Sequence, residues 1–369
     1  MHSAVWMGPW DLEERDPEGV LDELQQCGLT GARLAVAYPG GRLLLPRRPG
    51  RKVVDLHPGA VYAPVDPLRF GRLAPEFGPS DAVRVFLAAA GRREFPVYGW
   101  AVVCHNDHLG AAFPDCAVEN AFGDRYPYAL CPANPDVREY AAALCRALGE
   151  LDGLSGLDLE AVSYLGYEHQ SLHDMRGIKL GDEASLLLSL CFCEHCRRRH
   201  PSGTLRERVR DRVEQLLNRL PGAPVDPEAL SGFIEARRQT VRGLLAAIRQ
   251  ATPGVRLNLR ITQEPFATGG RTPVSWQDLE GLADEATLTY FGALLAPPDL
   301  PPPAARPIPL HAGTMFHGPD LAATVALLRH AEPDGLAFYL WSLANHAQVT
   351  ELGAVLRGAG SEAQCLPFP

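Results

Sequence analysis

The sequence predicts a (β/α)8 TIM barrel, and a doubly wound α/β sheet is the alternative fold. Three observations favour the barrel: eight short apolar segments have strand character, helices separate most of them, and polar residues collect where they end. The fifth segment also alternates between apolar and polar residues. The expected strands are Val5–Trp10, Ala32–Tyr38, Pro96–Val103, Gly156–Tyr164, Val255–Thr262, Glu285–Phe291, Ile308–Met315 and Gly335–Leu343.

The helices expected between these strands have clear start and stop signals. Asp16 can cap the first helix, Pro17 suits its first turn, and Gly28 suits its end. The other helices follow from apolar residues at helical spacing. They are Asp81–Ala90, Pro135–Leu148, Leu205–Leu220, Pro227–Ala251, Leu321–His330 and Val349–Leu356.

Length and composition limit the function. The 369 residues suit one elaborated barrel domain, 1–369, with an insertion after the fourth strand at 165–252. A net charge of −9 argues against a nucleic-acid partner, and no apolar run is long enough to predict a membrane span. Without a secretion signal, and with nine cysteines expected to be thiols or metal ligands, we expect a cytoplasmic protein.

The fourth expected strand carries two acids on an otherwise apolar segment. Asp158 and Glu160 lie two residues apart, so both side chains point to the same side of the strand. Because ionised carboxylates are rarely buried without partners, they are either a salt-bridged strand end or a catalytic group. In the catalytic interpretation Glu160 is the general acid or base and Asp158 assists from behind.

Three cysteines lie close together in the insertion. Cys191, Cys193 and Cys196 have the spacing Cys-x-Cys-x-x-Cys, which suits a structural Zn²⁺ ion better than a strained disulfide. Cys131, in a stiff Cys-Pro-x-x-Pro turn, is the first choice for the fourth ligand. The other candidates are Cys104, Cys116, Cys145, His195 and His200, and the alternative is a set of free thiols.

This pair of cysteine motifs resembles the zinc-bearing β-galactosidases of glycoside hydrolase family 42. The resemblance implies that Cys131, Cys191, Cys193 and Cys196 bind one structural zinc and that Glu160 is the acid/base. The chain departs from that family in two places: Leu159 replaces the asparagine before the glutamate, and Ile308 to Phe316 contains no carboxylate for a nucleophile. The Asp-x-Glu pattern of Asp158 and Glu160 is also similar to chitinase-like barrels.

Aromatic, histidine and amide side chains gather at the strand ends, as in a sugar-binding site. The loop after Glu160 adds several more. The expected substrate-binding residues are Trp10, Tyr38, His105, Asn106, His108, Tyr164, Tyr167, His169, His173, Tyr290 and Trp341.

We therefore expect a glycoside hydrolase that acts on a small glycoside or oligosaccharide. Such enzymes usually need two carboxyl groups, and Glu264 is the best candidate for the second, with Asp107 and Asp174 as alternatives. Two other functions stay open: a non-catalytic carbohydrate-binding barrel, and a metal-dependent lyase or isomerase. The lyase or isomerase would use His105, His108, His169 and His173. A homo-oligomer could form through the proline-rich segment Ala296–Pro309.

Overall fold

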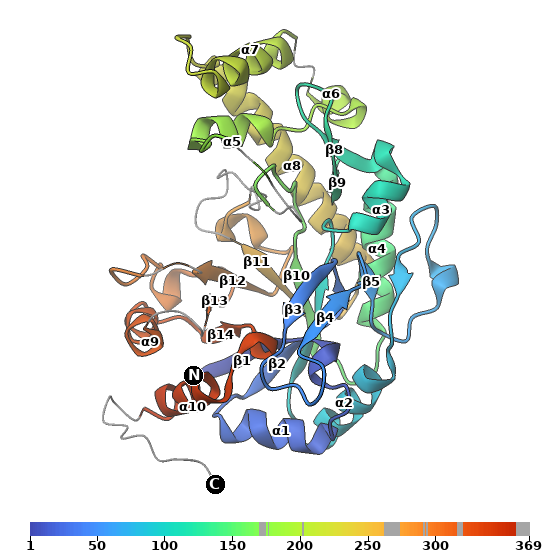
Figure 1. The fold of residues 1–369 in the computed structure, drawn as a ribbon, viewed down its shortest axis with the longest axis vertical. Coiled ribbons are helices and arrows are strands. Elements are labelled where there is room, and N and C mark those ends of the chain that lie inside the picture. Colours follow the sequence, from blue (N-terminus) through green and yellow to red (C-terminus); the bar gives the residue numbers. More distant parts are fainter. Residues whose placement is uncertain are drawn as a thin grey trace.

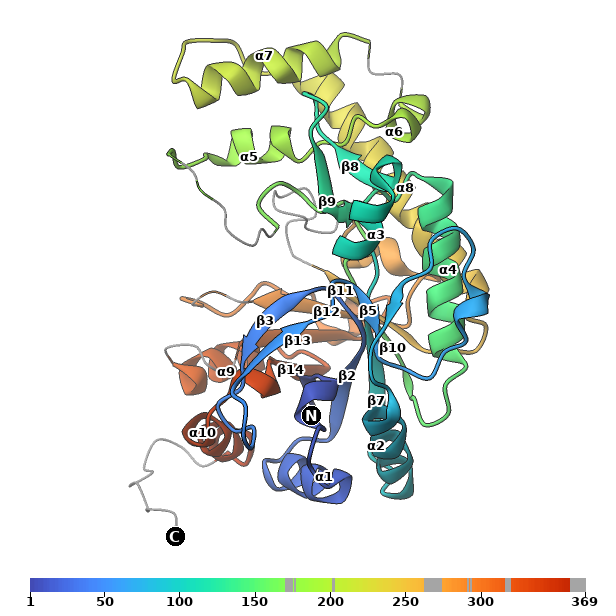
Figure 2. The same ribbon diagram turned by 45° about the vertical axis from the view of Figure 1, so that its right-hand side comes forward.

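Eight parallel strands form a closed barrel. The computed structural model describes residues 1–169, 175, 177–200, 203–261, 274–290, 292, 294–315 and 320–358. Strand β1 pairs with both β14 and β2, which closes the sheet and confirms the predicted barrel (Figures 1 and 2). The barrel strands are β1 His2–Met7, β2 Gly31–Tyr38, β7 Val97–Val102, β10 Gly156–Glu160, β11 Leu257–Ile261, β12 Glu285–Tyr290, β13 Leu310–Met315 and β14 Gly335–Tyr339.

Helices surround most of the barrel, and side-chain caps fix where several of them begin. Asp16 accepts a hydrogen bond from the Gly19 amide, and Asn134 accepts one from the Asp136 amide. In the described part of the connections on either side of β12, only the 3-10 turns η4 (Trp276–Leu279) and η5 (Pro303–Ala305) occur. The helices that follow barrel strands are α1 Pro17–Gln26, α2 Asp81–Arg92, α4 Pro135–Gly149, α8 Pro227–Ala251, α9 Leu321–His330 and α10 His346–Leu356.

Short strands occupy segments that the sequence predicted as loops. After β2 the hairpin β3–β4 (Gly41–Leu44, Val53–Leu56) forms, and β5 (Ala60–Val61) and β6 (Glu76–Phe77) extend the barrel sheet. After β7 the chain forms α3 (Asp107–Ala112) and the hairpin β8–β9 (Ala117–Glu119, Arg125–Leu130). These strands have two to six residues, too few for a period of two to stand out.

The insertion after β10 packs around its own small core. It contains α5 (Asp182–Leu188), α6 (Glu194–Arg199), α7 (Leu205–Leu217) and the first half of α8. Figures 1 and 2 show α5 and α7 at the end of the molecule opposite α1 and α10. A buried apolar cluster, separate from the barrel core, joins α5, α7 and α8: Ala121, Leu187, Leu190, Phe192, Leu205, Val209, Val213, Val225 and Phe233.

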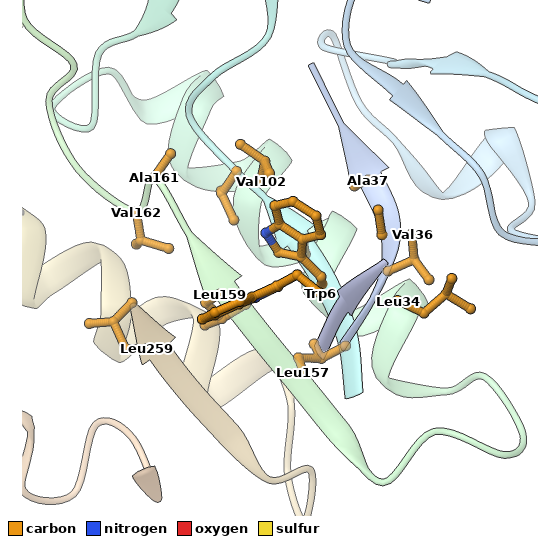
Figure 3. Packing of buried hydrophobic residues seen from close by; sticks show 14 of the residues in the cluster. Trp6, Leu34, Val36, Ala37, Val102, Leu157, Leu159, Ala161, Val162 and Leu259 are labelled. Carbon is orange, nitrogen blue, oxygen red and sulfur yellow. The ribbon is translucent and has the colours of Figure 1, made fainter. Parts of the chain in front are cut away.

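The two faces of the barrel wall differ in polarity. Leu157 and Leu159 of β10 and Leu259 of β11 are completely buried in the main apolar core, part of which Figure 3 shows. Asp158 and Asn258, which alternate with these leucines, are also buried, but they belong to a polar network inside the barrel. In the part of the chain that the structure describes, no helix combines the length and apolarity needed to span a membrane.

Candidate active site

A buried ionic network lies inside the barrel beneath Glu160. Asp158 accepts hydrogen bonds from the indole Nε1 of Trp6 at 2.6 Å, from Arg33 Nη1 at 2.8 Å and from Asn258 Nδ2. Thr287 Oγ1 accepts from Arg33 and donates to Asn258. Asp158 has no exposed surface and both of its oxygens are bonded, so it lies behind the site and cannot reach a substrate. The structure thus places Asp158 behind Glu160, and its assisting role in catalysis stays a prediction.

Glu160 lies at the carboxyl end of β10, and hydrogen bonds to only one of its two carboxylate oxygens hold the side chain in place. Its Oε2 accepts hydrogen bonds from Trp100 Nε1, at 2.6 Å, and from Arg260 Nη1. Its Oε1 accepts no hydrogen bond within the described chain, and 28% of the side chain is exposed. The next residue, Ala161, has a φ of 54°, an uncommon conformation for a residue with a side chain. One oxygen is thus fixed while the other stays available.

The surroundings of Glu160 favour its protonated form. Burial raises the pKa of this carboxyl group above its usual value of 4.5, while the Arg260 charge and the Trp100 hydrogen bond oppose the rise. Asp158 adds a smaller upward contribution. A carboxyl group with a raised pKa is suited to donate a proton near neutral pH.

Aromatic rings gather around this carboxyl group. Tyr38 lies with its ring centre 4.8 Å from that of Trp100, and its hydroxyl is 3.4 Å from the hydroxyl of Tyr339. The Arg260 guanidinium lies over Trp6 at 4.6 Å and near Tyr339 at 5.6 Å. Tyr38 and Tyr339 are half-buried, so part of each ring surface remains exposed. The site therefore combines a carboxyl group with ring surfaces that can contact a sugar.

Three members of this group were not predicted from the sequence. Trp100, Arg260 and Tyr339 were not named as candidates, although all three lie on barrel strands. The alternation in the fifth strand carried the signal for Arg260, because polar residues alternating with leucines in a barrel strand point inward. The indole of Trp100 gave no such signal, since an aromatic residue in an apolar strand also suits the core.

Three aromatic residues that were predicted to contact the substrate have buried rings, so the structure does not support that role for them. Trp10, Tyr164 and Trp341 are 2%, 1% and 0% exposed. Trp10 donates from its indole to Ser342 Oγ at 2.7 Å, the Tyr164 hydroxyl lies 3.4 Å from Cys196 Sγ, and Arg47 covers the Trp341 ring at 4.4 Å. These aromatic side chains fill the packed interior, which leaves no face for a sugar. Tyr290 is also buried, whereas Tyr167 is half-buried.

The predicted histidine cluster is only partly assembled. His105 Nδ1 and His169 Nε2 lie 3.1 Å apart and hydrogen-bond directly, and His108 instead lies 3.4 Å from Glu76. Asn106 caps α3 and also donates to the Gly59 carbonyl. No group of three potential metal ligands in the described chain contains a histidine. His173, Asp174 and Glu264 lie outside the described residues.

The four predicted cysteines meet at one point near the start of α6. The sulfur atoms of Cys131, Cys191, Cys193 and Cys196 all lie within 4.8 Å of one another, and all four are buried and unoxidised. Cys131 Sγ is 3.6 Å from Cys193 Sγ, 3.6 Å from Cys196 Sγ and 3.8 Å from Cys191 Sγ. Four sulfurs at a Zn–S distance of roughly 2.3 Å would be about 3.8 Å apart in a tetrahedron. The donor set therefore fits a tetrahedral ion.

A second group of possible ligands is already satisfied without a metal. Asp115, Cys116 and Asp136 lie close enough together to hold an ion. The Arg72 guanidinium, however, lies 2.8 Å from Asp115 and 2.5 Å from Asp136. This cation takes the place that an ion would fill.

The fold resembles those of solved glycoside hydrolases. No protein-family model and no curated protein matches the sequence. The PgaB (BpsB) glycoside hydrolase domain from Bordetella bronchiseptica aligns with a TM-score of 0.57 and 13% identity, over 96% of this chain and 99% of that one. A β-galactosidase from the psychrophilic Marinomonas ef1 aligns with a TM-score of 0.57 and 9% identity, over 97% of this chain and 59% of that one. A family 42 β-galactosidase from G. stearothermophilus aligns with a TM-score of 0.54 and 9% identity, over 97% of this chain and 56% of that one.

These identities establish a shared fold. The chain spans the whole PgaB domain but slightly more than half of each β-galactosidase. The predicted resemblance to the family 42 barrel is therefore confirmed at the level of the fold.

Proposed function

We propose that the protein is a glycoside hydrolase with Glu160 as the general acid/base. The observation that carries this proposal is the environment of Glu160 at the carboxyl end of β10. One oxygen is fixed by Trp100 and Arg260, the other is unbonded within the described chain, and burial raises the pKa. The barrel type, shared with solved glycoside hydrolases, supports the same reaction class.

Glu160 would protonate the glycosidic oxygen as the bond breaks. The resulting carboxylate would be stabilised by Arg260 and by the Trp100 indole. In a retaining reaction the second carboxyl group would bond to the anomeric carbon as the glycosidic bond breaks, and Glu160 would then take a proton from the water that displaces it. The half-buried rings of Tyr38 and Tyr339 would contact the sugar. Glu264, in a part of the chain that the structure does not describe, stays the first candidate for the second carboxyl group.

Replacement of Glu160 tests this assignment. Glu160→Gln should lower hydrolysis of a panel of aryl glycosides by a factor of about 100 or more, because Gln cannot donate the proton. Glu207→Gln changes an exposed glutamate of α7, serves as the control and should keep full activity. An active Glu160→Gln enzyme with an unchanged circular dichroism spectrum would refute the catalytic role.

A carbohydrate-binding barrel without activity is the second candidate. The observation that favours it is the ion pair of Glu160 with Arg260, because a neighbouring cation stabilises the carboxylate and opposes proton donation. A binding protein would show affinity for oligosaccharides by calorimetry and no turnover of any of them, with or without the Glu160→Gln change.

We also propose that Cys131, Cys191, Cys193 and Cys196 bind one structural Zn²⁺. Distances of 3.6 to 3.8 Å from Cys131 Sγ to the other three sulfurs, and the burial of all four cysteines, support this assignment. Four thiolates leave no ligand position open, so the ion would stabilise the fold and take no part in catalysis.

Elemental analysis of purified protein tests the zinc site. We expect one zinc per chain in the wild type and a large loss of zinc in Cys131→Ser. Cys145→Ser, which changes a buried cysteine outside the cluster, is the matched control and should retain the metal. Equal zinc content in the two variants would contradict the assignment of Cys131.

A further inference from the structure

Three arginines lie close to the thiol cluster: Arg138 and Arg237 are half-buried, and Arg199 is exposed. The side chains of Arg33, Arg47, Arg260 and Arg306 are 2% to 7% exposed, and each pairs with an acid. Arg138, Arg199 and Arg237 make no ion pair with any acid in the described chain. Because like charges repel and Arg138 and Arg237 are partly removed from water, a negative group beside these arginines would stabilise them.

The positions of these three arginines connect them to the cysteines. Arg199 and Arg237 line one small cavity together with Cys196 and Tyr164. The Arg237 guanidinium lies over the Tyr164 ring at 4.4 Å, and the Tyr164 hydroxyl is 3.4 Å from Cys196 Sγ. The cations therefore lie directly outside the buried sulfurs.

Arg138 lies on α4 and lines a cavity together with Arg199. Arg138 Nη2 donates to the Gly243 carbonyl at 2.9 Å, but Nη1 is buried and has no hydrogen-bond partner. Arg138 and Arg199 line a second cavity, of about 390 Å³, with Ala133, Pro135, His195 and Arg198. The only one of these lining arginines that pairs with an acid is Arg198, through Glu194. Burial, and then the nearby Arg199, lower the pKa of Arg138, which is the opposite of what a neighbouring carboxylate would do.

We propose that Arg138, Arg199 and Arg237 are the counter-charges of a tetrathiolate metal centre. Four thiolates and one divalent ion leave two negative charges in a buried position. Guanidinium groups at the rim of the cluster offset these charges and favour the deprotonated, metal-bound state. This inference rests on the proposed zinc site and adds the residues that determine how firmly the ion is held.

The rate of zinc transfer to a chromophoric chelator, from purified full-length protein at fixed pH, tests the proposal. Arg138→Gln and Arg199→Gln should release zinc about tenfold faster or more. Arg197→Gln is the matched control, because Arg197 is exposed like Arg199 and belongs to the same helix, but it lines neither cavity. Arg199→Lys keeps the charge and should stay within about twofold of the wild type, which separates charge from packing.

The outcomes separate this proposal from the zinc proposal. A wild type without zinc overturns both. A wild type with zinc, whose Arg138→Gln and Arg199→Gln variants release it at the rate of Arg197→Gln, overturns the counter-charge role alone. In that case, binding of inorganic phosphate by the wild type and its loss in Arg199→Gln would assign the arginines to a free anion in the larger cavity.

Discussion

At the scale of single residues, Asp11 shows how burial changes a carboxyl group that has no part in the proposed chemistry. Asp11 lies in the 3-10 turn η1 (Pro9–Asp11) after β1, and its Oδ2 accepts from the Gly8 amide at 2.8 Å and from Ser342 Oγ. Burial raises its pKa from 3.8 to about 6, and these hydrogen bonds oppose the rise.

The raised pKa of Asp11 predicts that Asp11→Asn stabilises the protein by an amount that depends on pH. Because the folded pKa lies above the unfolded one, the stability that Asp11 contributes is full below pH 3.8 and is lost as the pH rises through about 6. Asparagine keeps the single accepting oxygen and carries no charge. Urea unfolding should therefore show little difference at pH 4 and a gain of up to about 3 kcal/mol at pH 8. An equal change in stability at both pH values would contradict the raised pKa of the buried Asp11 carboxyl group.

Residue types indicated candidate residues, but they did not indicate the partners of those residues. Cys131 and Glu160 were identifiable because a stiff turn before a helix and a strand-end acid are local patterns. The partners of Glu160 come from other strands, since Trp100 lies on β7 and Arg260 on β11. Their contact depends on the register of the barrel, which no local pattern specifies.

At the scale of elements, the inward face of β10 depends on one buried ion pair. The side chains of Arg33 and Asp158 are 5% and 0% exposed, and their atoms lie 2.8 Å apart. The pairs Asp158–Asn258 on β11 and Asp158–Trp100 on β7 are adjacent across the sheet, so Asp158 joins three neighbouring strands. Loss of the cation would leave a buried carboxylate without a counter-charge.

Arg33→Met should therefore lower the free energy of unfolding by about 3 to 5 kcal/mol. Arg42→Met removes a partner from an exposed pair, Arg42–Asp55, whose side chains are 73% and 68% exposed. That control should change stability by less than about 1 kcal/mol. Urea unfolding of the two variants measures these changes. Similar losses of stability in both variants would show that the buried pair contributes no more than the exposed one.

The elements themselves were largely predictable, with errors at the ends of strands. All eight barrel strands were expected, and α8 has the expected bounds, Pro227–Ala251. The first strand was expected to reach Trp10 but ends at Met7, because Gly8 and Pro9 begin a 3-10 turn. The small strands β3 to β6 depend on long-range pairing and left no detectable pattern.

At the scale of the whole molecule, two apolar cores meet at the cysteine cluster. Cys131 and Cys191 belong to the main core, while Phe192, next in the chain, belongs to the small core of the insertion. The small core contains nine buried residues, so its apolar burial is modest compared with that of the barrel. We infer that a metal joining Cys131 to α6 would provide much of the stability of the insertion.

Removal of the metal should therefore loosen the insertion before the barrel. After treatment with a chelator, hydrogen exchange should increase in α5, α7 and the first half of α8, because their small core loses its attachment to Cys131. It should also increase in α6, which carries the ligand Cys196. Strands β1, β2 and β14 should keep their protection, since their hydrogen bonds close the barrel independently of the cluster. Cys131→Ser should show the same pattern without chelator, and Cys145→Ser should resemble the untreated wild type. Simultaneous loss of protection in the barrel and the insertion would show that the two cores unfold as one unit.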